Sequence, residues 1–343
     1  MRKLLNTLFV LSEDSYLALD GENVLVLRGD ETAGRFPLHT LESILCFSYK
    51  GASPALMGAC ASRSVALSFL TPRGRFLARS VGETQGNVLL RMEQCRRSDD
   101  PVSSCRLAQG FLVGKVYNCR SVLERATRDH GMRVDVDRLK HVSGILASAL
   151  GDITQCPTSA GLLGLEGECA AQYFGVFSQL VLNQKEAFAF HGRSRRPPLD
   201  RINALLSFLY TLLAHDCAAA LESVGLDPYV GFLHRARPGR ASLALDLMEE
   251  LRPIMADRLA LTLINNRMLH PNDLTEQENG AVLLDDAGRK TVLTAWQERK
   301  RDIITHPFLE EKLPWGLVPY VQALLLARHL RGDLDAYPPF LWK

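Results

Sequence analysis

The sequence predicts an α+β protein, in which a small β-rich N-terminal domain precedes a larger all-α C-terminal domain. The chain has 343 residues, more than one hydrophobic core usually holds, so about two domains are expected. In residues 1–83 short apolar runs alternate with turn residues, whereas in residues 84–343 apolar side chains recur with a helical period. We therefore place the domain boundary between residues 83 and 84.

The N-terminal domain is predicted to consist of short strands joined by hairpin-like turns. Turn residues separate its first apolar runs, which lie at residues 8–10, 16–19, 24–27, 35–38 and 43–47. A short helix is expected over residues 53–61, because Ser53 is a good capping residue and Pro54 suits the first helical turn. Two further strands, 64–70 and 75–78, complete the domain on either side of a turn at 71–74.

The C-terminal domain is predicted to be helical. Apolar residues at helical spacing indicate helices over residues 88–96, 109–128, 134–150, 160–182, 199–224, 242–265, 291–301 and 317–331. Pro197 and Pro198 cannot lie inside a helix, so residues 190–198 are expected to form an exposed loop between two helices.

Composition and charge are those of an ordinary globular protein. Apolar residues make up 47% and charged residues 23% of the chain, which argues against wholesale disorder. The formal net charge is +2, from 40 Lys and Arg against 38 Asp and Glu. This balance excludes a histone-like or polyanionic protein, but it leaves open binding of nucleic acid through local basic clusters.

Nothing in the sequence indicates secretion or membrane insertion. The longer apolar runs, such as residues 323–327, fall well short of the roughly 20 residues that a transmembrane helix needs. Glu13 and Asp14 follow the N-terminus too closely for a signal peptide. The eight cysteines form no C-x-x-C pair and are interpreted as buried, reduced thiols, which disfavours a structural zinc site. We expect a cytoplasmic protein with no membrane partner.

Glu166 is the first candidate site residue. It lies in an apolar helical stretch with Gly164 and Gly167 close on either side. Glycine inside a helix costs about 1 kcal/mol relative to alanine, and that cost is explained if another group must approach the backbone beside Glu166. The alternative is a pair of glycines that pack two helices together next to a partly exposed glutamate.

His234 is the second candidate, and it lies among arginines. A lone histidine after an apolar stretch is usually packed or simply exposed, but neighbouring cations favour a site that receives a phosphodiester. We predict phosphate contacts from two loops, through Arg235, Arg237 and Arg240 beside His234 and through Arg193, Arg195 and Arg196 in the loop 190–198. We expect the second loop to be mobile without DNA, because Gly192 and Ser194 offer its arginines little packing.

Acidic residues on one predicted helix complete the set. Asp246 shares a helical face with Glu249, three residues on, and with Glu250, four residues on, so helical geometry leaves both glutamates open. A solvated acidic face is the common interpretation of such a pattern. Together with Glu166 and His234, however, these carboxylates suit Mg²⁺ or Mn²⁺. Such a cation can polarise a phosphodiester and activate the attacking oxygen.

These segments, in this order and at these spacings, resemble one family. The residues that carry the resemblance are Leu165-Glu166-Gly167 with Tyr173 and Phe174 downstream, the loop 190–198 with Asp200 and Asn203 after it, Gly231-Phe232-Leu233-His234, and residues 243–249. The family is the CRISPR-associated integrase, the first of the numbered CRISPR-associated proteins and the core endonuclease of spacer acquisition. The resemblance covers nearly the whole chain.

The resemblance implies a metal-dependent DNA endonuclease and integrase that inserts captured foreign double-stranded DNA into a CRISPR repeat array, for antiviral defence. It implies that Glu166, His234 and Glu249 ligate Mg²⁺ or Mn²⁺, with Asp246 as an acidic companion in the catalytic site. The D-x-x-[DE] spacing of the family favours Glu249 over Glu250. Aspartate is the last ligand in some members, so glutamate is a mild departure that concerns the geometry of the metal.

The resemblance also implies an assembly. It points to a homodimer whose N-terminal domains make much of the contact, and to a small second CRISPR-associated protein that bridges two dimers. An apolar face between Leu8 and Phe47 is the predicted dimer surface, the alternative being that this face is the domain's own core.

Three other functions compete with that of a metal-dependent DNA endonuclease and integrase. In a non-catalytic DNA-binding scaffold the arginines would only position DNA, and the acidic residues would be a solvated helix face. An all-α enzyme acting on diphosphates would need a second acid-rich helical motif, which the sequence lacks. A di-iron bundle would need paired Glu-x-x-His motifs, and the chain has none.

Overall fold

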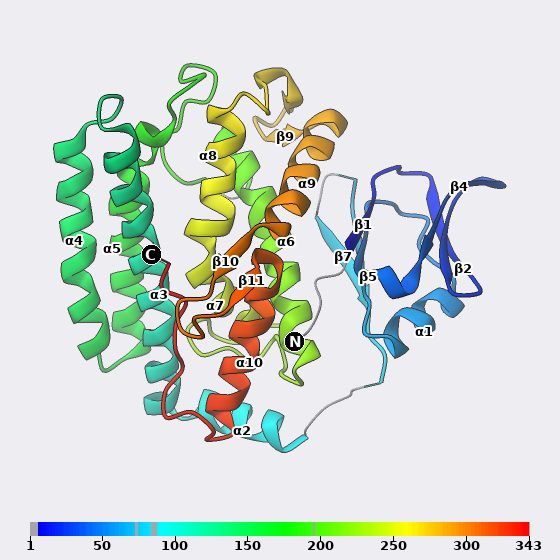
Figure 1. Ribbon diagram of the computed structural model, residues 1–343, viewed down its shortest axis with the longest axis horizontal. Helices are drawn as coiled ribbons and strands as arrows, with labels where there is room; N and C mark the ends of the chain where they lie inside the picture. Colours follow the sequence, from blue (N-terminus) through cyan, green and yellow to red (C-terminus); the bar gives the residue numbers. More distant parts are fainter. Residues whose placement is uncertain (1–5, 73–74, 84–87, 195, 343) are drawn as a thin grey trace. The chain divides into compact units, whose positions relative to one another are not determined.

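The computed structural model describes residues 6–72, 75–83, 88–194 and 196–342. The chain divides into two compact units (Figure 1), one made of Met1–Gln85 with Leu284–Asp302 and the other of Gly86–Leu283 with Ile303–Lys343. The first unit is rich in strands and the second is mostly helical, so the predicted fold class is confirmed. The helix α9 (Asp286–Arg301) lies within the predicted C-terminal domain but belongs to the first unit.

The described strands of the N-terminal unit form two sheets. The strands are β1 (Asn6–Val10), β2 (Ser15–Asp20), β3 (Asn23–Arg28), β4 (Glu31–Pro37), β5 (Leu41–Cys46), β6 (Ala66–Leu70) and β7 (Phe76–Ser80). One sheet has the order β2-β3-β4 and the other β1-β5-β6-β7. The predicted hairpins join β2, β3 and β4, but β1, β5 and β6 run parallel, which hairpins alone cannot produce.

A helix supplies the crossover that the parallel strands β5 and β6 require. This helix, α1 (Pro54–Ser62), begins as predicted: the Ser53 side chain accepts a hydrogen bond of 3.2 Å from the backbone N–H of Leu56, and Pro54 is its first residue. The helix α9 is tied to the same unit by an ion pair of 2.8 Å between Lys300 Nζ and Glu42 Oε1.

The core of this unit consists of side chains from both sheets and from α1. Its buried members include Val10, Leu17, Val24, Ile44, Leu56 and Leu67. The apolar residues between Leu8 and Phe47 therefore mainly fill the unit's own core, which is the alternative stated for this face, and a dimer contact through the N-terminal units stays a prediction. An alternating apolar pattern specifies which side chains face inward, but it does not say which element covers them. The homodimer itself stays a prediction.

The helical unit is built around one long central helix. Its helices are α2 (Val88–Asp99), α3 (Pro101–His130), α4 (Val136–Gln155), α5 (Ser159–Val176), α6 (Arg201–Ser223), α7 (Ser242–Leu251), α8 (Arg258–Asn265) and α10 (Val318–Leu330). The central helix α3 packs against α4, α5 and α7 (Figure 1). Two short strand pairs were not predicted, β8 (Leu274–Glu276) with β9 (Val282–Leu284) and β10 (Ile303–Thr305) with β11 (Lys312–Pro314). Runs of three residues are too short to show a periodicity.

Two predicted helices end earlier than expected. The helix expected over 160–182 ends at Val176 and continues as the 3₁₀ turn η2 (Phe177–Leu180). The helix expected over 242–265 is interrupted by η3 (Arg252–Asp257), a π-helical segment that contains Pro253. Proline has no N–H to continue the helical hydrogen bonds, and the wider turn changes which side chains face the interior.

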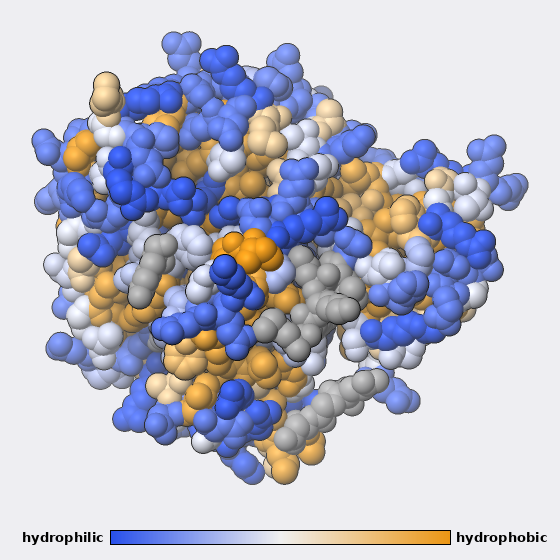
Figure 2. Space-filling model, in the orientation of Figure 1, coloured by the Kyte–Doolittle hydropathy of each residue, from blue (hydrophilic) through white to orange (hydrophobic). Residues whose placement is uncertain are grey.

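The surface and the cysteines add two details. On the face shown in Figure 2, hydrophilic and apolar side chains are interspersed. The helix α6 is long and apolar enough to cross a membrane by length and composition, and 61% of its most apolar window is buried inside the protein. All eight cysteines are free thiols, but Cys95 is exposed and Cys156 is half-buried, which corrects the expectation that all are buried.

Candidate functional site

Glu166 and Glu249 meet around a buried lysine. Glu166 comes from α5 and Glu249 from α7, and the Lys115 ammonium of α3 hydrogen-bonds both carboxylates, Glu166 through Oε1 and Glu249 through Oε2 at 2.7 Å. The side chains of Lys115 and Glu249 are each 5% exposed, whereas that of Glu166 is 23% exposed. The cluster is therefore reached from the side of Glu166.

Close packing of α3 against α7 brings Lys115 to this place. A Cβ at Gly114 would lie 2.7 Å from the Cβ of Glu250, closer than two carbon atoms pack, so glycine is needed for this approach. The next residue, Lys115, is buried with its charge. A buried ammonium is tolerated when it is paired and hydrogen-bonded, and the two glutamates meet that requirement.

His234 is held by Asp246. The fully buried Asp246 carboxylate accepts hydrogen bonds from the backbone N–H groups of Phe232, Leu233 and His234, at 2.6, 3.0 and 2.9 Å, and from His234 Nδ1 at 2.6 Å. A Cβ at Gly231 would lie 2.9 Å from Asp246 Oδ2, so this loop also needs its glycine. Because Nδ1 is engaged by Asp246, Nε2 is the ring nitrogen available to a ligand, an arrangement common in metal-ligating histidines.

Arg252 fixes the second glutamate. Its Nη1 lies 2.8 and 3.0 Å from the two carboxylate oxygens of Glu249. Burial alone would raise the pKa of Glu249, but Arg252, Lys115 and His234 outweigh it and lower this pKa well below its usual range. Glu249 is therefore ionised at neutral pH.

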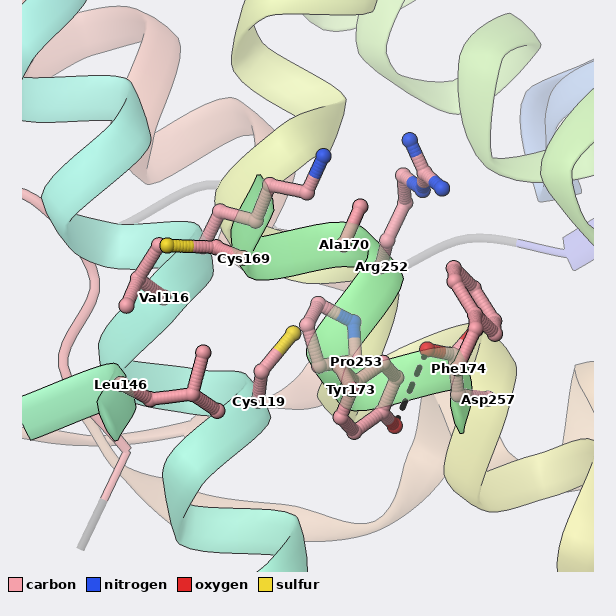
Figure 3. A pocket seen from close by; sticks show the side chains of 11 residues that line it. Val116, Cys119, Leu146, Cys169, Ala170, Tyr173, Phe174, Arg252, Pro253 and Asp257 are labelled. Atoms are coloured by element: carbon pink, nitrogen blue, oxygen red, sulfur yellow. Dashed lines mark hydrogen bonds between the residues drawn. The ribbon is translucent and has the colours of Figure 1, made fainter. Parts of the chain in front are cut away.

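A buried network behind the site orients Arg252. The segment η3 turns Arg252 onto the ring of Tyr210, 4.4 Å from its centroid. The hydroxyl of Tyr210 donates to Asp257 Oδ1 at 2.5 Å and that of Tyr173 to Asp257 Oδ2 at 3.2 Å. Figure 3 shows Tyr173, Arg252 and Asp257 around a cavity of about 10 Å³, about the size of one water molecule. π-Helical turns recur at functional sites.

An open groove of about 550 Å³ adjoins Glu166. Side chains of α5 and of the loop after Phe190 line it, among them Glu166, Gly167, Phe174 and Arg193. Nothing lies within 4 Å of the position where a Cβ of Gly164 or Gly167 would be. These glycines therefore do not pack two helices together, and the open space supports the interpretation that another group approaches beside Glu166.

The predicted DNA-binding arginines differ in their surroundings. Arg193 is half-buried: it donates to the Ser194 carbonyl at 2.7 Å and to Asn203 Oδ1, and lies 5.1 Å from the centre of the Tyr210 ring. The expectation that Arg193 has little packing is wrong, because Asn203 and Tyr210 contact its side chain; mobility of the loop without DNA stays a prediction. Arg195 lies outside the described residues. The others are exposed at Arg196, Arg235 and Arg237 and half-buried at Arg240.

Glu250 points away from this cluster. Its carboxylate accepts hydrogen bonds from Tyr337 Oη at 2.5 Å, Gln322 Nε2 at 2.9 Å and the backbone N–H of Phe340 at 2.9 Å. Glu249 and not Glu250 therefore faces Lys115. Burial raises the pKa of Glu250 to about 7, although these hydrogen bonds oppose the shift.

This pKa predicts how stability depends on pH. Folded Glu250 keeps its proton up to about pH 7, whereas in the unfolded chain it ionises near its ordinary value of 4.5. The unfolded state therefore binds fewer protons in this window, and stability falls as pH rises from about 4.5 to about 7, by roughly 3 kcal/mol. Glu250→Gln should flatten this decline in urea unfolding curves measured from pH 4.5 to pH 8. A wild-type-like decline in the variant would contradict the assignment.

The side chains of the cluster can be compared with those that a metal ion needs as ligands. Among the residues that the structure describes, no three His, Cys, Asp or Glu side chains converge closely enough to hold one ion as they stand. The donors nonetheless suit Mg²⁺ or Mn²⁺, because Glu166 and Glu249 already share one cation, the Lys115 ammonium. Ligation of a metal by Glu166, His234 and Glu249 stays a prediction.

Three residues of the cluster and its surroundings, Lys115, Arg252 and Asp257, were not predicted from the sequence. Arg252 could have been found, since it follows Glu249 by three residues within the helix predicted over residues 242–265. Lys115 left a weaker signal, as the only charged residue of α3 between Arg106 and Arg120. Asp257 left none, because its inward direction depends on η3.

Comparisons with known proteins agree on one family. The family model "CRISPR associated protein Cas1" matches residues 8–298. The chain is similar to the CRISPR-associated endonuclease Cas1 2 of Rhodospirillum rubrum, at 53% identity over the full length of both chains. It is also similar to the CRISPR-associated endonuclease Cas1 1 of Chlorobaculum tepidum, at 48% identity over the full length of both chains.

Solved structures share the fold. A casposase bound to its integration product matches with a TM-score of 0.84 at 22% identity, over 99% of this chain and 95% of the casposase. A Cas1 protein from Thermotoga maritima matches with a TM-score of 0.82 at 19% identity, over 96% and 97%. A chain of a Cas6-RT-Cas1–Cas2 complex matches with a TM-score of 0.81 at 21% identity, over all of this chain and 36% of that one.

Proposed function

The chain belongs to the Cas1 family of CRISPR-associated proteins, and from this premise we propose that it is a divalent-metal-dependent DNA endonuclease and integrase. It inserts captured foreign DNA into a CRISPR array and so serves antiviral defence. One observation carries this proposal: carboxylates from two separate helices share a cation beside an oriented histidine and an open groove. Relatives named as endonucleases and a neighbour bound to an integration product support it.

The reaction proposed is a transesterification on DNA. A 3′-hydroxyl of the captured fragment attacks a phosphodiester of the repeat, forming a new P–O bond and releasing a 3′-hydroxyl on the repeat strand. A bound Mg²⁺ or Mn²⁺ supplies charge stabilisation and activation of the attacking oxygen. Glu166, His234 and Glu249 would hold the ion, while Asp246 orients the imidazole and Arg252 keeps Glu249 ionised and in place. The groove beside Glu166 admits the DNA.

The assembly proposed follows from the geometry of the reaction. Integration joins DNA at both ends of a repeat, whereas each chain carries one candidate site, so at least two subunits must be held at a fixed spacing. We propose a homodimer bridged by a small second CRISPR-associated protein, Cas2. The structural match to a chain of a Cas1–Cas2 complex supports this partner. The assembly would act in the cytoplasm, where the CRISPR array is reached.

An integration assay tests the proposal. A short duplex, a supercoiled plasmid with a repeat, and Cas2 are combined with the protein and Mn²⁺, Mg²⁺ or EDTA. Joined products should appear with either metal and vanish with EDTA. DNA binding without cleavage or joining under every metal condition would favour the non-catalytic scaffold instead.

The exposed arginines predict the salt dependence of DNA binding. Arg235 and Arg237 lie on the loop after His234 and are exposed, so replacing both by Gln should weaken binding for every sequence tested. The slope of log affinity against log salt should fall by about 0.9 for each duplex phosphate that the variant no longer neutralises. Arg331→Gln is the control, since this exposed arginine is paired with Asp333 at 2.7 Å. An unchanged slope in the double variant would show that this loop does not contact phosphates.

A further inference from the structure

Lys115 occupies the position between the two carboxylates. Its Nζ hydrogen-bonds one oxygen of Glu166 and one of Glu249, from different helices. With only 4% of the residue exposed, this ammonium has little access to water and depends on these carboxylates for its stabilisation. The same oxygens are the donors that the proposed metal site requires.

The charges of the cluster are already balanced. The positive charges of Lys115 and Arg252 offset the negative charges of Glu166 and Glu249. Arg252 hydrogen-bonds both carboxylate oxygens of Glu249. A divalent ion bound to the two glutamates would stand beside the Lys115 ammonium, and at such short range in a buried site like charges repel strongly. The ion and the ammonium therefore compete for one position.

We propose that Lys115 is a placeholder cation, which holds Glu166 and Glu249 together in the metal-free protein and must leave the shared position when a divalent ion binds. The inference rests on the metal site of the proposed function. It also explains why no three potential ligands among the described residues converge as they stand: the ammonium fills the space between two of them.

Arg252 does not share this role. Arg252 is held in place from two sides. It hydrogen-bonds the two carboxylate oxygens of Glu249, and its guanidinium lies against the Tyr210 ring. Lysine carries a compact charge on a flexible stem, whereas arginine makes a planar, fixed set of contacts. The cluster thus combines one fixed cation that keeps Glu249 ionised with one movable cation that yields to the metal.

Metal binding to the full-length protein tests the proposal without an activity readout. Mn²⁺ is titrated calorimetrically into metal-stripped wild type, Lys115→Met and Lys140→Met. Methionine keeps much of the length of the lysine side chain and removes its charge. Lys140 is the matched control, because it pairs with Glu124 at the surface and is 52% exposed. Lys115→Met should bind Mn²⁺ about tenfold more tightly than wild type, or better, and Lys140→Met should match wild type.

Thermal unfolding supplies a second readout on the same proteins. Without metal, Lys115→Met should melt at a lower temperature than wild type, because the buried Glu249 and the half-buried Glu166 have lost a shared counter-ion. Saturating Mn²⁺ should raise its melting temperature by more than it raises that of wild type. Equal or weaker Mn²⁺ binding by a folded Lys115→Met, while wild type binds, would overturn the placeholder role and leave the metal site standing. No Mn²⁺ binding by any of the three proteins would contradict the metal site itself, and the placeholder role with it.

A measurement on wild type covers the case in which Lys115→Met fails to fold. Reductive methylation of lysines, read by mass spectrometry at Lys115, should increase when Mn²⁺ is added, because the ammonium has left its two carboxylates. Labelling of Lys140 should stay constant. Unchanged or reduced labelling of Lys115 in protein shown to bind Mn²⁺ would overturn the proposal.

Discussion

Replacing Glu166 by Gln is expected to reduce metal-dependent strand transfer by about a thousandfold, while the protein still folds and binds DNA. Glutamine keeps the shape of the side chain but removes the negative charge that a divalent ion needs. Because Glu166 is the more exposed carboxylate of the cluster, its neutralisation should disturb the fold less than a change at Glu249. Product formation in the integration assay and thermal unfolding are measured on the same preparations.

Two further variants make this result specific. Glu168→Gln is the control, since Glu168 lies two residues away on α5, is exposed, and does not line the groove; it should retain wild-type activity. His234→Ala should lose activity as Glu166→Gln does, because it removes the imidazole that Asp246 orients. Full activity of folded Glu166→Gln with saturating metal would show that this carboxylate does not take part in the reaction.

Local signals in the sequence were sufficient to predict most of the elements. The cap of α1 was correctly placed because Ser53 and Pro54 act on the backbone next to them. The parallel pairing of β1 with β5 was missed, since it joins residues that are far apart in the sequence. No local pattern shows next to which strand of the sheet β1 will lie. The interruption at η3 was missed because a proline in a helical pattern can end, kink or widen the helix.

The candidate site was predictable to the extent that its residues form short motifs. Spacing put Asp246 and Glu249 on one helical face, flanking glycines singled out Glu166, and neighbouring arginines singled out His234. The resemblance to a family then assigned the ligand roles. The counter-ions needed tertiary packing: Lys115 reaches the site only because Gly114 lets α3 and α7 approach closely. The aromatic partner of Arg252 likewise comes from another helix, and no local pattern announces such a contact.

Helical geometry alone left the choice between Glu249 and Glu250 open. In the structure the two carboxylates have different partners, and those of Glu250 come from a part of the chain far away in sequence. Tyr337 and Phe340 hydrogen-bond Glu250 from near the C-terminus, whereas Glu249 faces Lys115 and Arg252. The two adjacent carboxylates should therefore respond in opposite ways to the same substitution.

Glu249→Gln should abolish strand transfer and also destabilise the protein, by about 3 to 5 kcal/mol. The amide cannot balance two buried cations, so Lys115 and Arg252 would be left with too little negative charge. Glu250→Gln should retain most of the activity at pH 7. Because the pKa of Glu250 is about 7, a large share of the wild-type molecules already carries a neutral side chain there. Both variants are compared in the integration assay at pH 7, with urea unfolding as the measure of stability.

The opposite pattern, with activity retained in Glu249→Gln and lost in a folded Glu250→Gln, would move the metal ligand to the other glutamate. It would also require α7 to turn so that Glu250 left Tyr337, Gln322 and Phe340 for the side of Lys115. Such a turn would leave three buried hydrogen-bonding groups without partners. Each buried group without a partner costs about 1 to 3 kcal/mol. That cost is the physical reason why we propose Glu249, and not Glu250, as the metal ligand.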